Sequence, residues 1–387
     1  MKRKFLAALL AGLMTVLLVA CNPQSTTNTP APTPEATAPV GETTNPETTP
    51  EEDTYMADLI AAAQAEGELV VYGSCEDPYI AAACQAFEAK YGIKTSWQRL
   101  TGGEVQAKIE EENGNPSADV WFGGTSDPQS VCASEGLLEA YDARNAVNLV
   151  SDKFRDPDGY WYGIYRGVLG IFYNMEELDR LNLPYPTDWD DLLDAKYKGL
   201  IWFSNPNTAS TAKLTINTFV QMRGLDAAME FFKALDPNVA QYTKSGGGPS
   251  KSVGSGECVI GIGFLHDAIY QITQGYDNIG MCVPASGTSC EIGATSMFKG
   301  CKHPNAAKLW IEFALTSECV ELAAGAGSYQ FLLLKDAQQP EVVAQFNLNP
   351  DNTIDYDFAD AKANTTTYVE TFFTTIGANA DDRFKTE

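Results

Sequence analysis

The sequence has few basic residues for its length. Among its 387 residues, 26 Lys and Arg stand against 51 Asp and Glu, which gives a formal charge of −25. Nucleic-acid binding needs stripes of Lys and Arg that neutralise phosphates, and no such stripe occurs, so we expect no nucleic-acid partner. A small anionic ligand is not excluded, because a few well-aimed donors inside a cleft outweigh a distant charge that salt screens.

Metal-binding and catalytic patterns are also missing from the sequence. The only histidines are His266 and His303, and no CxxC spacing occurs, which argues against a zinc site. A Gly-Ser-Gly at 254–256 lacks the strand–elbow–helix context of a hydrolase nucleophile. We therefore expect no enzyme activity, no cofactor and no metal.

The one long apolar run stands at the N-terminus. Lys2, Arg3 and Lys4 precede residues 5–20, a run too short to span a bilayer comfortably, which ends in small residues at Cys21. This is the anatomy of a secretory signal. Leu18-Val19-Ala20-Cys21 resembles the bacterial lipobox, which implies that residues 1–20 are removed and that Cys21 is lipidated. The alternative is an ordinary signal peptide beside an incidental cysteine.

Composition divides the rest of the chain in two. Residues 21–54 are mostly Thr, Pro, Asn, Ala and Glu, too polar to bury a core, and we expect a disordered stalk there. A lipid anchor with such a stalk is typical of a Gram-positive envelope, outside the cell membrane. From residue 55 onward about 330 residues remain, enough for two domains.

Eight cysteines follow Cys21, at positions 75, 84, 132, 258, 282, 290, 301 and 319. An even number in an exported chain is consistent with disulfides. The sequence does not assign the pairs.

Strand-like and helix-like segments alternate along the chain. We expect strands at 68–72, 94–98, 118–122, 160–174, 200–203, 258–264 and 295–298, and helices at 56–64, 79–91, 105–112, 190–193, from about 211 to 222, and at 227–234, 304–314 and 317–324. This order predicts an α/β fold with a largely parallel sheet. Ligands gather at the carboxyl ends of such strands, where Ser74 and Thr125 follow glycines.

Two segments are rich in hydrogen-bond donors. Residues 204–211, which include Ser204, Thr208, Ser210 and Thr211, offer hydroxyls and free N–H groups at a helix start, a favourable anion site. The alternative is simple N-capping. The glycine-rich loop 245–249, with Gly247 at its centre, could bring backbone donors close to a ligand or could be only a turn.

Three further polar residues flank predicted strands. His266 and Asp267 follow strand 258–264, where they could hydrogen-bond vicinal hydroxyls, or instead form a helix cap and a surface histidine. Glu291 precedes the strand around 295 and could accept from a ligand hydroxyl or from nearby amides.

From about residue 69 to residue 334 the chain resembles the substrate-binding lipoproteins of bacterial ABC importers. The group spans binders of ferric ion, 2-aminoethylphosphonate and hexose phosphate. The matching segments are 118–124, 197–201, 254–261, 287–299, 305–308 and 328–330. The resemblance implies a two-lobe, type II periplasmic-binding-protein fold with hinge crossover strands. It implies lobe I at 55–165 and 293–387, and lobe II at 166–292.

Within that group, the resemblance favours the hexose-phosphate branch. Iron binders carry adjacent tyrosines after the strand at 258–264, whereas this chain has Phe264-Leu265-His266, which cannot supply oxygens to ferric iron. The hexose-phosphate branch carries His-Asp and then Glu, which would make His266, Asp267 and Glu291 ligands of sugar hydroxyls. The phosphate group would be bound by the small donors Ser74, Thr125, Ser204, Thr208, Ser210, Thr211 and Gly247.

The expected function is capture of a small phosphorylated or polyhydroxylated anion for delivery to an ABC permease and its ATPase, by a monomer tethered to the membrane. A ferric or other metal receptor of the same fold is one alternative. An envelope sensor or adhesin with a protein partner is another, and an extracellular hydrolase ranks third because two histidines do not assemble a nucleophile–base pair.

Overall fold

The computed structural model describes residues 50–346, 348, 350–351, 353–377 and 383–384. The expected signal peptide, Cys21 and most of the expected stalk lie outside these residues. The first helix, α1 (Pro50–Glu66), begins four residues before the expected end of the stalk.

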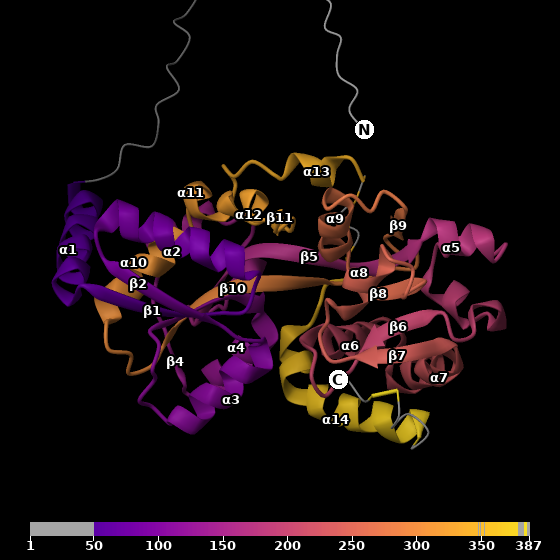
Figure 1. Cartoon of the computed structure of the whole chain (residues 1–387). Coiled ribbons are helices and arrows are strands. Elements are labelled where there is room, and N and C mark those ends of the chain that lie inside the picture. Colours follow the sequence, from indigo (N-terminus) through magenta and orange to yellow (C-terminus); the bar gives the residue numbers. More distant parts are fainter. Residues whose placement is uncertain (1–49, 347, 349, 352, 378–382, 385–387) are drawn as a thin grey trace, which may run out of the picture. The chain divides into compact units, whose positions relative to one another are not determined.

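Strands and helices alternate through the first two thirds of the described chain (Figure 1). The strands are β1 (Glu68–Gly73), β2 (Lys94–Arg99), β3 (Val120–Thr125), β4 (Leu138–Glu139), β5 (Trp161–Asn174), β6 (Ile201–Ser204), β7 (Val239–Thr243), β8 (Ile260–Phe264), β9 (Ile279–Cys282), β10 (Cys290–Phe298) and β11 (Phe331–Leu332). The helices after α1 are α2 (Asp77–Tyr91), α3 (Gly102–Glu112), α4 (Ser126–Ser134), α5 (Met175–Arg180), α6 (Ser210–Arg223), α7 (Leu225–Leu235), α8 (Gly248–Val253), α9 (Leu265–Thr273), α10 (Pro304–Ala314), α11 (Ser317–Val320), α12 (Leu322–Gly325), α13 (Glu341–Ala344) and α14 (Phe358–Ile376).

All the described strands belong to one sheet with two parallel parts. The order is β2-β1-β3-β10-β5-β8-β6-β7, with β4 on β10 and both β9 and β11 on β5. Strands β1, β2 and β3 are parallel to one another, as are β6, β7 and β8. The long strands β5 and β10 are antiparallel to their neighbours and run between the two parts (Figure 1). The α/β prediction is confirmed, and the sheet is mixed because these two strands cross it.

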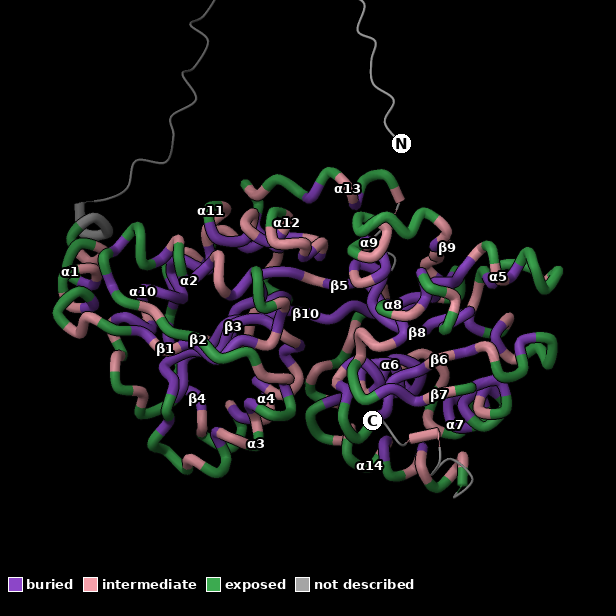
Figure 2. The backbone as a smooth tube through the Cα atoms, in the orientation of Figure 1, coloured by how far each residue is buried: buried purple, intermediate pink, exposed green. Residues whose placement is uncertain are grey.

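Each part of the sheet has apolar layers on both faces, since neighbouring side chains of a strand point to opposite sides. In the first part Val71 and Phe122 pack with α2 and α10, while Tyr72 and Trp121 pack with α3 and α4. The second part has a core of its own. Figure 2 shows this pattern as buried strands beneath helices with exposed outer faces.

The C-terminal helix α14 completes the second core. Its Val369 and Phe372 are buried in the cluster that contains Phe232 and Tyr242. The expected lobe boundaries instead assign residues 293–387 to the first lobe. The helix contacts α6 and α7, although it follows elements that pack in the first core.

Several predicted boundaries need correction. Strand β10 begins at Cys290, so Glu291 lies inside the strand and not before it. The helix expected at 317–324 is two short helices, α11 and α12. Helices α9 and α14 and strands β7 and β9 were not expected. The described part of the chain holds no helix long and apolar enough to cross a membrane.

The disulfide expectation is wrong for the described residues. All eight cysteines after Cys21 are free thiols, and six of them are buried. All of them except Cys290 belong to the apolar clusters of the two cores, where they pack as small apolar side chains.

Candidate ligand-binding site

A pocket of about 200 Å³ lies where β1, β3 and β8 end. Nine of the ten expected ligand residues line it: Ser74, Thr125, Thr208, Ser210, Thr211, Gly247, His266, Asp267 and Glu291. They come from both parts of the sheet and from the crossing strand β10. Parallel strands that end at one edge bring these distant segments together.

Ser74, directly after β1, is held as a hydrogen-bond donor. Its Oγ accepts a hydrogen bond of 2.9 Å from the Trp121 indole, which leaves the hydroxyl hydrogen for the pocket. Gly124 makes room for it, because a Cβ at Gly124 would lie 2.5 Å from the Ser74 Cβ. Gly124 also has φ +75°, a conformation that favours glycine. Its N–H donates to the Tyr165 hydroxyl at 2.9 Å.

Helices α4 and α6 both begin at the pocket with N–H groups that no side chain caps, and both have hydroxyl side chains there. Thr125 is the N-cap of α4 and makes no capping hydrogen bond, and its buried hydroxyl has no partner in the described chain. The N-cap of α6 is Ala209, which has no side-chain oxygen, and Ser210 and Thr211 follow in the first turn. The capping alternative is therefore wrong for α6. Hydroxyls and N–H groups at two helix starts favour an anion.

Two expected donors are placed differently. The Thr208 hydroxyl donates to the Lys244 carbonyl at 2.7 Å, so its hydrogen is already used. Ser204 is fully buried at the end of β6 and does not line the pocket. The sequence places Ser204 after an apolar strand, whereas in the structure it is the last residue of that strand and its side chain is buried.

His266 and Asp267 lie in the first turn of α9, which has Phe264 as its N-cap. The surface-histidine alternative is wrong, because His266 is only 7% exposed. Its ring stacks on Phe264, with centroids 5.4 Å apart. Its Nε2 lies 3.7 Å from Asp267 Oδ1 and 3.7 Å from Glu291 Oε1, too far for hydrogen bonds. The three side chains therefore keep polar atoms available for a ligand.

Gly167 on β5 makes space for this group. A Cβ at Gly167 would lie 2.5 Å from His266 Cε1 and 2.9 Å from Glu291 Oε1. A glycine is needed here because the backbone of β5 forms the wall against which the imidazole and the carboxyl group rest.

Burial changes the acidity of both carboxyl groups. It raises the pKa of Glu291 well above its usual value, and the charges of Asp267 and Glu76 raise it further. Burial also raises the pKa of Asp267, while the neighbouring His266 lowers it. The polar atoms of this group are thus poorly solvated until something binds them.

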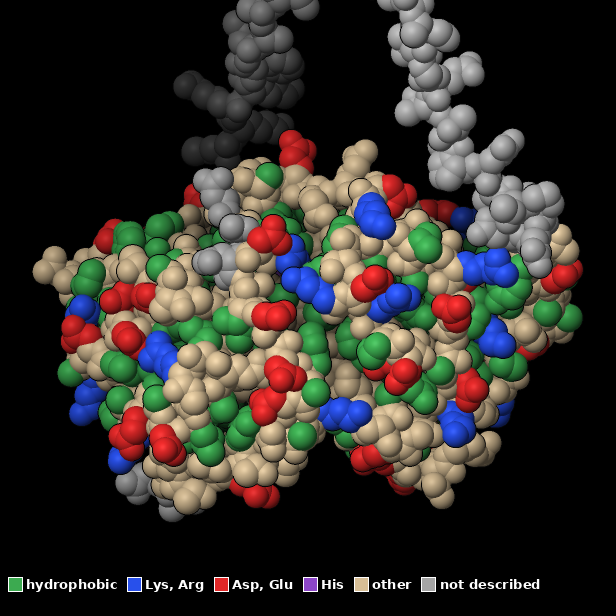
Figure 3. Space-filling view, turned by 180° about the vertical axis from the view of Figure 1, so that it is seen from behind, with side chains coloured by type: hydrophobic (Ala, Val, Ile, Leu, Met, Phe, Trp, Pro, Cys, Tyr) green, Lys and Arg blue, Asp and Glu red, His purple; other side chains and the backbone are tan. Residues whose placement is uncertain are grey.

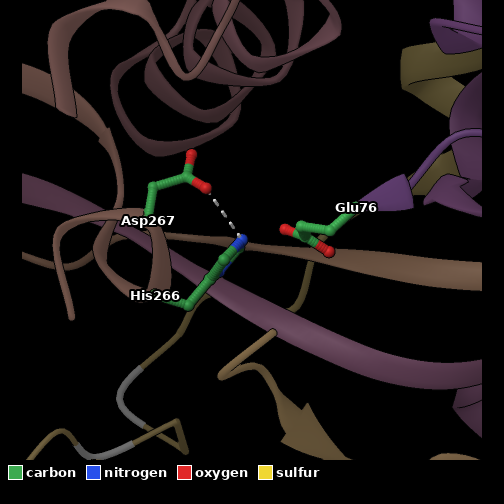
Figure 4. Close-up of side chains that lie close together, drawn as sticks. All are labelled: Glu76, His266 and Asp267. Carbon is green, nitrogen blue, oxygen red and sulfur yellow. Dashed lines mark ion pairs between the residues drawn. The ribbon is translucent and has the colours of Figure 1, made fainter. Parts of the chain in front are cut away.

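The sequence alone missed several pocket residues, including Glu76, Arg99, Tyr165, Lys251 and Gln330. Glu76 is the N-cap of α2, and a carboxyl oxygen of Glu76 lies within 4.8 Å of a ring nitrogen of His266 and a carboxyl oxygen of Asp267. Figure 4 shows the three side chains directed toward one another. The only indication of Glu76 in the sequence is that it is a charged residue shortly after the end of a predicted strand. These three atoms could coordinate a small cation or accept hydrogen bonds from a ligand. Phe264 and Leu265 are buried and add no oxygen ligands for ferric iron.

Comparison with known proteins agrees with this architecture. A family model described as "Bacterial extracellular solute-binding protein" matches residues 115–362. A Haemophilus influenzae protein is 41% identical over 303 residues, which cover 77% of this chain and 86% of that protein.

Solved structures show the same fold. The periplasmic binding protein AfuA from Actinobacillus pleuropneumoniae, determined with exogenous fructose-6-phosphate bound, is 38% identical, with a TM-score of 0.75 over 80% of this chain and 98% of that one. A ferric binding protein from Campylobacter jejuni is 19% identical, with a TM-score of 0.70 over 79% of this chain and 99% of that one, a likeness of fold alone. The fold is thus the two-lobe, type II periplasmic-binding-protein fold, and the chain belongs to the family of bacterial extracellular solute-binding proteins.

Proposed function

We propose that this protein captures a sugar phosphate, or a closely similar phosphorylated polyol, and delivers it to the permease of an ABC importer. One observation carries the proposal. The same pocket holds unpartnered donors at the starts of α4 and α6 and an unpartnered imidazole with buried carboxyl groups on α9 and β10.

The two sets of residues suit the two halves of such a ligand. Phosphate oxygens are acceptors, which suit the hydroxyls of Ser74, Thr125 and Thr211 and the N–H groups beside them. Sugar hydroxyls are donors, which suit Asp267 and Glu291. The likeness to AfuA, whose structure contains fructose-6-phosphate, supports this assignment.

Binding would couple to closure of two lobes around strands β5 and β10. We assign lobe I to 55–165 and 293–357, and lobe II to 166–292 together with α14, whose apolar face packs in the second core. Glu291 on β10 and Tyr165 on β5 place pocket residues on the crossing strands themselves. A ligand that contacts both lobes and these strands would favour the closed arrangement.

We further propose that Cys21 carries the lipid that holds the monomer outside the membrane, and that residues 22–49 act as a tether. Such a tether raises the effective concentration of the loaded protein at its permease and ATPase. In this function the ligand leaves unchanged, so the protein is a binder and not an enzyme.

Titration calorimetry tests the ligand class. We expect fructose 6-phosphate and glucose 6-phosphate to bind more tightly than inorganic phosphate or 2-aminoethylphosphonate, because only the sugars reach His266 and Asp267. Thr211→Val removes one pocket hydroxyl and should weaken both sugar phosphates about tenfold, as expected for a hydrogen bond to a charged group. Thr374→Val, on an exposed turn of α14, is the matched control. Failure of every phosphorylated compound to bind would refute the proposal.

Membrane fractionation tests the anchor. The wild type should sediment with membranes and incorporate radiolabelled palmitate, and Cys21→Ser should do neither. Wild-type protein that is soluble and unlabelled after export would establish the ordinary signal peptide instead.

A further inference from the structure

Three carboxyl groups meet at one end of the pocket, and they come from three different elements. Glu76 is the N-cap of α2, Asp267 lies on α9 and Glu291 lies on β10. The Glu76 carboxyl oxygen lies within 4.8 Å of the ligand atoms of His266 and Asp267 (Figure 4). Glu76 is thus close in space to Asp267 and Glu291, which lie far from it in the sequence.

No basic side chain neutralises this group directly. Within residues 50–346 and the other described positions, the ion pairs of Asp267 and Glu291 are those with His266, and no Lys or Arg lies within 4 Å of the three carboxyl groups. Arg99 and Lys251 also line the pocket, but the Arg99 Nε donates to the Cys75 carbonyl at 3.3 Å. Elsewhere basic residues lie scattered among acidic ones, as on the face in Figure 3.

The His266 imidazole provides a second, independent sign of a ligand. It is more than nine-tenths buried, and its Nε2, which faces the carboxyl groups, makes no hydrogen bond in the described chain, whereas its Nδ1 is enclosed beside Gly167. Figure 4 shows its Nε2 directed between Glu76 and Asp267. Leaving such a group unpaired is costly, so a bound group is expected to lie among these atoms.

Glu76 is held in place as a fixed acceptor. Its Oε2 accepts a hydrogen bond of 2.7 Å from the hydroxyl of Ser328, which is fully buried. The same hydroxyl contacts the side chain of Gln330, which also lines the pocket. A carboxyl group fixed in this way cannot swing aside to admit a second negative charge.

Resting on the proposed function, we propose that Glu76 is a specificity-determining residue that, with Asp267 and Glu291, restricts the ligand to sugar monophosphates whose other end carries only hydrogen-bond donors. An amino group is favoured there over a hydroxyl, because an ammonium donates hydrogen bonds to all three carboxyl groups and balances the Glu76 carboxylate. A second phosphate or a carboxylate is rejected, because it would lie beside the Glu76 carboxylate inside a pocket poorly screened by water.

Two matched ligand pairs test the proposal by calorimetry. Fructose 1,6-bisphosphate differs from fructose 6-phosphate by one phosphate, and we expect it to bind about 100-fold more weakly. Glucosamine 6-phosphate differs from glucose 6-phosphate by one amino group, and we expect it to bind about tenfold more tightly.

The variant Glu76→Gln separates charge from size. Glutamine has nearly the same shape and still accepts from Ser328, so exclusion by size alone would persist in it. We expect the affinity ratio between fructose 6-phosphate and the bisphosphate to shrink from about 100 to about 10, and the ratio between the amino sugar and glucose 6-phosphate to fall to about one, both measured within the same variant. Asp77→Asn is the matched control, because it removes an exposed carboxylate one residue away on the same helix.

The outcomes distinguish the two proposals. Equal ligand preferences in Glu76→Gln and wild type, with fructose 6-phosphate bound tightly by both, would overturn the role of Glu76 and leave the proposed function standing. Equal affinity of the wild type for glucosamine 6-phosphate and glucose 6-phosphate would also overturn the inference. If neither monophosphate binds the wild type, the proposed function fails and the inference fails with it.

Discussion

Replacing Gly167 with alanine should disable the pocket while leaving the fold in place. The added Cβ would lie 2.5 Å from His266 Cε1 and 2.9 Å from Glu291 Oε1. Ordinary contact begins at 3.4 Å, so the imidazole must move by about 0.9 Å or more. The strand itself need not move, because the atoms nearest to the added Cβ belong to side chains and not to the backbone.

The magnitude follows from the precision that hydrogen bonds require. A shift of about 1 Å carries a donor–acceptor distance of about 2.9 Å outside the range of a good hydrogen bond. Each hydrogen bond that involves a charged group contributes about 1.5–3 kcal/mol. Loss of one from His266 and one from Glu291 therefore predicts about 3–6 kcal/mol, or at least a 100-fold loss of affinity. The free energy of unfolding should fall by only about 1–3 kcal/mol, the usual cost of overpacking.

Calorimetry with fructose 6-phosphate and urea denaturation of the same samples would measure both quantities. Gly325→Ala is the control, since nothing lies within 4 Å of a Cβ at that position. Affinity within threefold of wild type in a folded Gly167→Ala protein would refute the assignment of His266 and Glu291 to the ligand site.

Substitutions at three other positions can be tested in the same way. Asp267→Ala should weaken sugar-phosphate binding at least tenfold without unfolding the protein, and the exposed Asp277→Ala should not; equal affinities in calorimetry would remove Asp267 from the site. Burial raises the pKa of Asp127 to about 6, so the native state holds this proton more tightly than the unfolded state, and its contribution to stability is lost as pH rises from about 4 to 6. Asp127→Asn should therefore be about 3 kcal/mol more stable than wild type at pH 7 and equal to it near pH 4 in urea titrations, and an unchanged pH profile would contradict this. Tyr165→Phe removes the acceptor of the Gly124 N–H and should speed the hydrogen exchange of that amide and weaken phosphate binding several-fold, whereas unchanged exchange would show that the bond does not form.

Most of the fold could be predicted because local patterns agree with the final packing. The apolar runs at β1, β3 and β8 are buried on both faces of the sheet, so their strands stand out in the sequence. Helix α9 was missed because it follows β8 without an intervening loop, and the apolar run continues into Leu265. The start of β10 was missed because Glu291 is charged, and only its place between the two cores shows that a carboxyl group is buried there.

The site could be predicted in part for a similar reason. Residues after strand ends, such as Ser74, Thr125 and Asp267, can be found from the strands that precede them. The role of a glycine such as Gly167 cannot be found in this way, because its neighbours His266 and Glu291 are about 100 residues away in sequence. Likewise, the sequence does not show that Ser328 fixes Glu76 across 252 positions.

The position of α14 in the second core has a consequence for how the protein is made. Phe372 packs against Phe232 and Tyr242, so about 130 residues separate the two sides of one apolar contact. During export the second core therefore stays incomplete, with part of its aromatic surface exposed, until nearly the whole polypeptide has crossed the membrane. A premature stop codon before residue 358 would therefore spare most pocket residues and still yield a protein that aggregates or is degraded.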